Sequence, residues 1–149
     1  ADLFLCSEVI EHVPDDAVLL DNLSRLVKPG GHLLLTTQSG EIRRTEKFRG
    51  HLRHYDLDPL CSALASRGLR VTARLRCGWP LLDLQKILAE RFFAQVQALI
   101  LDREGVSLGT RLIFALFYHA YKVCSYRRGP QLLVFAQRSA EDGPRRAAP

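Results

Sequence analysis

Asp2-Leu3-Phe4-Leu5-Cys6 is a short apolar run, and Ser7-Glu8-Val9-Ile10-Glu11-His12 follows it at once. The apolar run predicts a buried β-strand, and two carboxylates and an imidazole then fall within five positions. In an open α/β sheet, polar side chains directly after a strand lie at the carboxyl edge, where such sheets bind ligands. If residues 8–12 form one helical turn, Glu8, Glu11 and His12 share a face that can hold a cation, orient a hydroxyl group or move a proton.

The next two blocks extend this strand into an α/β pattern. Pro14-Asp15-Asp16 predicts the start of a helix, because acidic residues favour the first turn, and apolar residues recur at helical spacing over residues 19–27. Pro29-Gly30-Gly31 ends that helix. His32-Leu33-Leu34-Leu35-Thr36-Thr37 predicts a second strand, buried on both faces as parallel strands are.

The second half of the chain is less regular. Residues 41–54 are polar and aperiodic, and they predict a loop that crosses the site. Asp58-Pro59 starts a helix that Gly68 ends. Residues 69–76 alternate apolar and basic side chains, which is typical of a half-exposed strand, and residues 131–136 predict the last strand.

Residues 80–128, between the last two predicted strands, form a helical insertion. An apolar stripe from Leu81 to Leu99 predicts one helix, and residues 105–109 break it. The apolar run Leu112–Tyr118 predicts a second helix that ends at about residue 124. The run is too short to cross a bilayer, which needs about 20 residues. It predicts core packing or a lid over the site, or else an interfacial helix that gives residues 108–124 a peripheral membrane contact. The cations that suit anionic headgroups in that case are Arg111, Lys122, Arg127 and Arg128.

The blocks at residues 2–14 and 26–37 resemble the second half of a class I S-adenosylmethionine (SAM) dependent methyltransferase. They correspond to the fourth strand with its loop, and to the end of the next helix with the fifth strand. The resemblance covers residues 2–78, with a weaker echo at residues 130–138. It implies a partial Rossmann-like α/β fold in which the first two of four strands are parallel and the last is antiparallel to its neighbours.

The resemblance also implies the chemistry and the cofactor. The cofactor is SAM, and Cys6, Ser7 and Glu8 lie near it, the first two through their backbone. His12 faces the acceptor as general base with Glu11 beside it, because an imidazole titrates near working pH. The reaction is methyl transfer to an oxygen, nitrogen or carbon of a small-molecule acceptor, with oxygen preferred.

A second interpretation of the same residues is a metal site. Glu-x-x-Glu-His resembles the magnesium-binding motif of small-RNA 2′-O-methyltransferases, in which a further histidine comes from the loop after the fifth strand. The corresponding residue here is His54, with His51 as the substitute, and Val13 stands where that family has a second histidine. Mixed carboxylate and imidazole ligands suit Mn²⁺, Zn²⁺ or, less typically, Mg²⁺. The candidate ligands are Glu8, Glu11, His12 and His54; a third interpretation gives the first three only a structural role.

Two motifs of the family are absent from the sequence: a Gly-rich turn after a strand, and an acidic residue for the ribose. We therefore expect residues 1–138 to be the C-terminal part of a methyltransferase domain whose SAM-binding half precedes Ala1. Residues 139–149 predict a disordered tail. The chain alone is not expected to catalyse transfer, and a non-catalytic remnant or partner-binding subunit is the alternative from another class.

The net charge and the cysteines of the chain indicate which class of partner and which cellular compartment to expect. The net charge of +5 comes mostly from dispersed arginines, and without a dense basic cluster it argues against nucleic-acid binding. The four cysteines are widely spaced and form no C-x-x-C pair. They predict free thiols in a reducing compartment, and thus a cytoplasmic protein.

Overall fold

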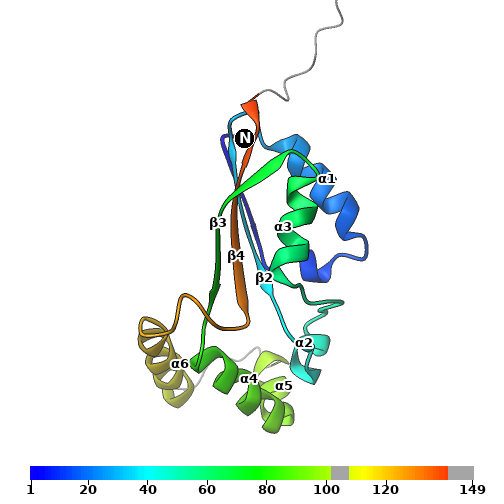
Figure 1. Cartoon of the computed structure of the whole chain (residues 1–149). Coiled ribbons are helices and arrows are strands. Elements are labelled where there is room, and N and C mark those ends of the chain that lie inside the picture. Colours follow the sequence, from blue (N-terminus) through cyan, green and yellow to red (C-terminus); the bar gives the residue numbers. More distant parts are fainter. Residues whose placement is uncertain (102–107, 141–149) are drawn as a thin grey trace, which may run out of the picture.

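The computed structural model describes residues 1–101 and 108–140, and a four-stranded sheet organises this part of the chain (Figure 1). The order of the strands is β1-β2-β4-β3. Each strand begins and ends within two residues of its predicted position. The bounds are β1 (Leu3–Ser7), β2 (His32–Gln38), β3 (Leu69–Cys77) and β4 (Gln131–Arg138).

Strand direction places three strand ends at one edge of the sheet. β1 and β2 run parallel, with Leu3 opposite His32, whereas β4 runs antiparallel to both β2 and β3, which confirms the predicted topology. Because Gln38 and Cys77 both lie opposite Gln131, the carboxyl ends of β2 and β3 fall at the same edge as that of β1. Residues that follow these strands are therefore brought together there.

Two helices cover one face of the sheet and form the core with it. α1 (Asp16–Leu26) begins at Asp15, whose carboxylate accepts a hydrogen bond from the Val18 N–H at 3.0 Å. Such an N-cap stabilises a helix by about 1 kcal/mol. α3 (Leu57–Ala65) lies beside α1 (Figure 1). The core side chains are Cys6, Ile10, Leu20, Leu23, Val27, Leu33, Leu35, Leu60, Leu64, Leu69, Val134 and Ala136.

The prediction that the second strand is buried on both faces is wrong. In β2, Leu33 and Leu35 are fully buried, but the residues that alternate with them are only half-buried. In β1, Leu3 and Leu5 are 62% and 61% exposed. The physical reason is that α1 and α3 pack against one face of the sheet, and these two leucines point to the other face.

The segment after β1 is not the single helical turn that would align Glu8, Glu11 and His12. Glu8 has a φ of 52°, in the left-handed region. A short 3₁₀ helix, η1 (Ile10–His12), begins only after it. The reversed backbone at Glu8 separates its side chain from the two that follow.

The loop predicted over residues 41–54 contains one short helix. α2 (Arg44–Phe48) begins where the Glu46 carboxylate accepts a hydrogen bond from the Arg43 N–H at 2.8 Å. Periodicity does not reveal a helix of five residues, because it makes little more than one turn. α2 matters for the site because the chain leaves it directly before His51.

The insertion folds as helices at the carboxyl edge of the sheet (Figure 1). They are α4 (Leu81–Arg91), α5 (Phe93–Leu101) and α6 (Leu108–Tyr121). The apolar stripe predicted as one helix is broken at Phe92, where φ is −109° and ψ is 40°, well before the predicted break. α6 begins within the break predicted at residues 105–109, and residues 105–107 lie outside the described residues. Of the tail predicted over residues 139–149, residues 141–149 also lie outside them.

Candidate functional site

Three side chains gather at the carboxyl edge of β1 and form the Glu11–His12–His51 cluster. Glu11 and His12 come from η1, His51 comes from the loop after α2, and a carboxylate oxygen and two ring nitrogens all lie within 4.8 Å of one another. Glu11 is fully buried, His51 is 9% exposed, and His12 is more exposed than either. A hydrogen bond of 2.8 Å from the Leu52 N–H to the Glu11 carbonyl ties the two segments together.

Gly50 sets the orientation of His12. The Gly50 carbonyl lies 3.1 Å from His12 Nδ1, and because a carbonyl only accepts, Nδ1 carries the hydrogen. Gly50 has a φ of 89°, a conformation that glycine adopts readily. In its neutral form, His12 therefore presents an unprotonated Nε2.

His54 sets the tautomer of His51 in the same way. His54 Nδ1 lies 3.0 Å from the Gly40 carbonyl and donates to it, and His54 Nε2 lies 3.1 Å from His51 Nδ1. Burial lowers the pKa of both imidazoles, and the neighbouring histidine charges lower the pKa of His51 further. A neutral His54 accepts at Nε2, so His51 donates from Nδ1 and its Nε2 is left unprotonated.

The Glu11 carboxylate is only half satisfied. Its Oε2 accepts a hydrogen bond from Thr37 Oγ1 at 2.8 Å, whereas its Oε1 is buried and has no hydrogen-bond partner among the described residues. Burial raises the pKa of the Glu11 carboxyl, and the charge of Glu8 acts in the same direction. A buried oxygen without a partner, beside two free ring nitrogens, can take up a proton or a cation.

An ion pair between Glu46 and Lys86 lies beside His54. Glu46 Oε2 lies 3.8 Å from His54 Nε2, and Glu46 Oε1 lies 2.7 Å from Lys86 Nζ on α4. Burial on its own raises the pKa of Glu46, but the Arg43 N–H and the Lys86 ammonium together lower it, so this carboxylate stays ionised. Residue types and spacing in the sequence do not indicate this contact between two distant segments.

Glu8 lies apart from the cluster. Its carboxylate accepts hydrogen bonds from Thr36 Oγ1 at 2.9 Å, Gln38 Nε2 at 3.1 Å and Gln131 Nε2 at 2.6 Å. These bonds tie the end of β1 to β2 and β4, and they occupy both oxygens of Glu8. The structure therefore does not bring together the four predicted ligands Glu8, Glu11, His12 and His54; it brings together Glu11, His12 and His51.

The residues predicted to line SAM lie at an edge of the described sheet. β1 is an outer strand, so one side of its backbone has no neighbouring strand within the described ranges. Cys6 is 4% exposed, and its side chain belongs to the core. Ser7 is exposed, with Oγ 2.9 Å from Thr36 Oγ1. The backbone positions of Cys6 and Ser7 fit a ligand at the carboxyl end of this strand, whereas the Glu8 side chain is already engaged.

The loop after α2 packs against the cluster and does not simply cover it from solvent. The Tyr55 hydroxyl lies 3.1 Å from the Ile10 carbonyl and 2.9 Å from the Asp16 carboxylate. Burial, and then the hydrogen bond to Asp16, raises the pKa of Tyr55. Arg53 Nη1 also lies 3.0 Å from Asp16. These contacts fix the path of the loop and so place His51, which the sequence indicated only as a substitute for His54.

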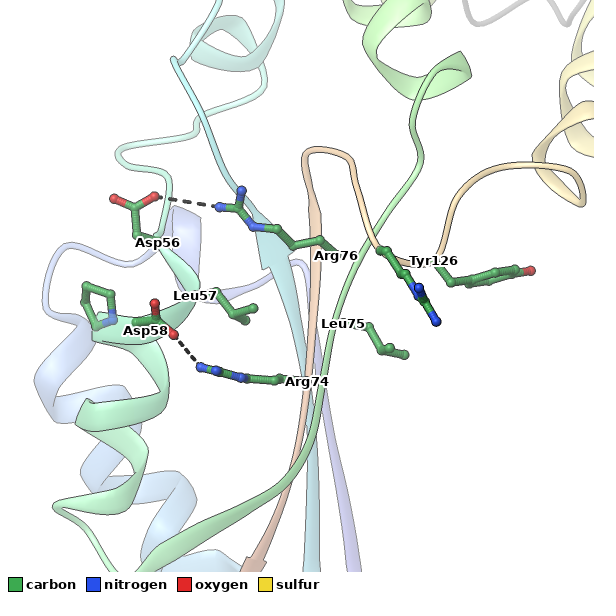
Figure 2. A pocket seen from close by; sticks show the side chains of 9 residues that line it. Asp56, Leu57, Asp58, Arg74, Leu75, Arg76 and Tyr126 are labelled. Carbon is green, nitrogen blue, oxygen red and sulfur yellow. Dashed lines mark hydrogen bonds and ion pairs between the residues drawn. The ribbon is translucent and has the colours of Figure 1, made fainter.

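Two described cavities lie near this edge, and neither is lined by Glu11, His12 or His51. A cavity of about 620 Å³ is lined by β3 and the start of α3, and Figure 2 shows Arg74 and Arg76 reaching toward Asp58 and Asp56 there. Its lining contains no histidine or cysteine. A second cavity, of about 500 Å³, includes Gly40 and so adjoins the carbonyl that binds His54.

Comparison with protein families and curated sequences finds methyltransferases. A family model described as a methyltransferase domain matches residues 1–74. The ubiquinone biosynthesis O-methyltransferase of Vibrio cholerae serotype O1 is 38% identical over 42 residues, which make up 28% of this chain and 17% of that relative. The matched segment is thus a small part of the relative's length.

Two solved structures share the fold. Phosphoethanolamine N-methyltransferase 2 from Haemonchus contortus, in complex with phosphomonomethylethanolamine and S-adenosylhomocysteine, matches 93% of this chain and 33% of its own, with a TM-score of 0.50 and 14% identity. The cyclase SpnF matches 93% of this chain and 49% of its own, with a TM-score of 0.55 and 17% identity. Identities this low show the fold alone, and a fold can serve more than one reaction.

Proposed function

Because this chain belongs to the class I SAM-dependent methyltransferases, we propose that it carries the acceptor side of an enzyme that methylates a hydroxyl group of a small molecule. His12 is the general base, Glu11 and His51 support it, and the backbone of Cys6 and Ser7 meets the methionine end of SAM. The observation that carries the proposal is the cluster in which ring nitrogens of His12 and His51 lie within 4.8 Å of a Glu11 carboxylate oxygen, while both Nδ1 atoms are hydrogen-bonded to other groups.

The residues of this chain account for the proton that the acceptor loses. SAM, when bound, supplies an electrophilic methyl group for in-line displacement by the acceptor oxygen. His12 Nε2 takes the hydroxyl proton, and the Gly50 carbonyl, 3.1 Å from Nδ1, holds the imidazolium in place. The Glu11 carboxylate stabilises the positive charge, and positioning of the acceptor supplies much of the remaining acceleration.

Two observations support a small-molecule acceptor. The cavity of about 500 Å³ beside Gly40 falls within the size range of small-molecule pockets, and the curated relative acts, by its name, in ubiquinone biosynthesis. The test uses an enzyme form that joins a SAM-binding half to this chain, labelled SAM, and either catechol or a short single-stranded RNA as acceptor. Label on catechol supports the proposal, label on RNA alone supports a 2′-O-methyltransferase, and label on neither supports a non-catalytic role.

A metal-assisted form of the reaction is the second candidate, favoured by the unpartnered Glu11 Oε1. Glu11 Oε1, His12 Nε2 and His51 Nε2 are the ligands in this candidate. One carboxylate and two imidazoles suit Mn²⁺ or Zn²⁺ better than Mg²⁺, and the hydrogen bonds from both Nδ1 atoms hold the tautomer that a ligand needs. A cation there would lower the pKa of an acceptor hydroxyl.

If the metal candidate is correct, the chain binds Mn²⁺ or Zn²⁺ in isothermal titration, and Glu11→Gln raises the Kd by at least about 10-fold, since even outer-shell changes cost 10–100-fold. Glutamine keeps an acceptor for Thr37 and removes the charge. Glu8→Gln is the matched control, because it makes the same change three positions earlier and should leave the Kd unchanged. No binding by the natural sequence, or equal losses in both variants, refutes the metal candidate and leaves the base role of His12 intact.

The 149-residue chain alone is expected not to bind SAM at micromolar concentrations. The physical reason is that the Gly-rich turn and the ribose-binding acidic residue, which supply cofactor contacts in Rossmann-like folds, are absent from its sequence. Isothermal titration with SAM measures this, with a form joined to a SAM-binding half as the positive control. Saturable micromolar binding by the chain alone would contradict the prediction.

A further inference from the structure

We propose that residues 108–128, which comprise α6 and the segment after it, form a surface that docks on an anionic lipid bilayer. The first observation is the exposure of its apolar residues. Leu108, Leu112 and Leu116 are 74%, 63% and 70% exposed, and their spacing of four residues places them on one face of α6. Val123, two residues after α6, is 82% exposed and continues the apolar surface.

The same surface carries only positive charge. Residues 105–140 contain no Asp or Glu. Lys122 Nζ lies 5.3 Å from the ring centroid of Tyr118, which joins an ammonium to an amphipathic ring of the kind that favours membrane interfaces. An apolar stripe flanked by cations matches the acyl boundary and the anionic headgroups of a bilayer. The exposed cations of the surface are Arg111, Lys122, Arg127 and Arg128.

The length of α6 suits a helix that lies on a bilayer. Its 14 residues rise about 21 Å, which is less than the roughly 30 Å of the hydrocarbon core. Within residues 1–101 and 108–140, no helix is long and apolar enough to cross a membrane. α4, which lies against α6 (Figure 1), and Phe92, which directly follows it, also expose apolar side chains: Ile87 and Phe92 are each 51% exposed.

The 108–128 surface belongs to the same end of the molecule as the Glu11–His12–His51 cluster. The insertion leaves the sheet after Cys77, which lies opposite Gln131, and the end of β2 lies opposite the same residue. An acceptor that partitions into lipid would approach the cluster from this side, and that consequence rests on the proposed function. The docking itself depends only on the surface.

Co-sedimentation of the 149-residue chain with vesicles tests the proposal. We expect binding to equimolar phosphatidylcholine and phosphatidylglycerol, little binding to phosphatidylcholine alone, and weaker binding at high salt. The double variant Arg127→Gln/Arg128→Gln should lower the partition coefficient about 25-fold, or about 5-fold per cation. Leu112→Gln/Leu116→Gln should also lose binding, because it removes buried apolar area.

The matched control is Leu3→Gln/Leu5→Gln, which removes two similarly exposed leucines from β1 and should bind as the natural sequence does. Circular dichroism checks that each variant keeps its fold. Absent binding to the anionic vesicles, equal binding to neutral ones, or an equal loss in the β1 variant overturns the proposal. The proposal is also overturned if the chain forms a dimer without lipid that only Leu112→Gln/Leu116→Gln dissociates, because the surface then binds a second copy of the chain. None of these measurements uses SAM or turnover, so a failure of docking is distinct from a failure of methyl transfer.

Discussion

Replacing His12 with alanine should lower kcat by about 10²–10⁴-fold in an enzyme form that includes a SAM-binding half. The variant removes the Nε2 atom that takes the acceptor proton in the proposed mechanism, while the partners that fix its orientation, such as the Gly50 carbonyl at 3.1 Å, remain. KM for the acceptor should change much less than kcat, because the proton moves in the chemical step. Initial rates of label transfer from SAM, at saturating acceptor, measure the effect.

Rescue of activity by added imidazole distinguishes a base role of His12 from a structural role. Because His12 is the most accessible member of the cluster, added imidazole should restore part of the activity of His12→Ala if the residue is a base. His32→Ala is the control; His32 begins β2 at the opposite end of the sheet and stacks on Phe135 at 5.4 Å. An unchanged kcat in His12→Ala would remove both the base and the metal candidates and leave the segment after β1 a structural role.

Replacing Leu35 with alanine should destabilise the chain by about 2–5 kcal/mol, because it opens a cavity in a closely packed core. Leu35 lies in β2, is fully buried, and belongs to the core formed with α1 and α3. For a chain of this size the loss corresponds to a fall in Tm of roughly 5–15 °C. Thermal unfolding followed by circular dichroism measures it.

Leu5→Ala is the matched control, because Leu5 points to the opposite face of the sheet from Leu35 and its side chain is exposed. Leu5 is a leucine of the adjacent strand β1, but it is 61% exposed. Its replacement should change stability by no more than about 0.5 kcal/mol, as is usual for surface positions. Equal losses at Leu5 and Leu35 would mean that the second face of the sheet is also covered, and would contradict the one-sided core.

Local patterns of residues were enough to predict the strands of the sheet and its first helix. Apolar runs predicted β1, β2 and β4, and an alternation of apolar and basic residues predicted β3. Pro14-Asp15-Asp16 predicted the start of α1, because acidic residues favour the first turn of a helix. The directions of the strands followed from the resemblance carried by residues 2–14 and 26–37, whereas their order came from the structure. The chemistry of the segment after β1 was also visible, since Glu11 and His12 are adjacent in the chain.

Which residues join Glu11 and His12 depends on how distant segments of the chain pack together. A left-handed φ at Glu8 sends its carboxylate to β2 and β4, and one local backbone angle of this kind has no periodic signal. His51 replaces His54 because the ring nitrogens of His54 are engaged by the Gly40 carbonyl and by His51 itself. Those partners converge from separate segments through packing, so the free nitrogen of His51 is a property of the folded chain and not of any stretch of its sequence.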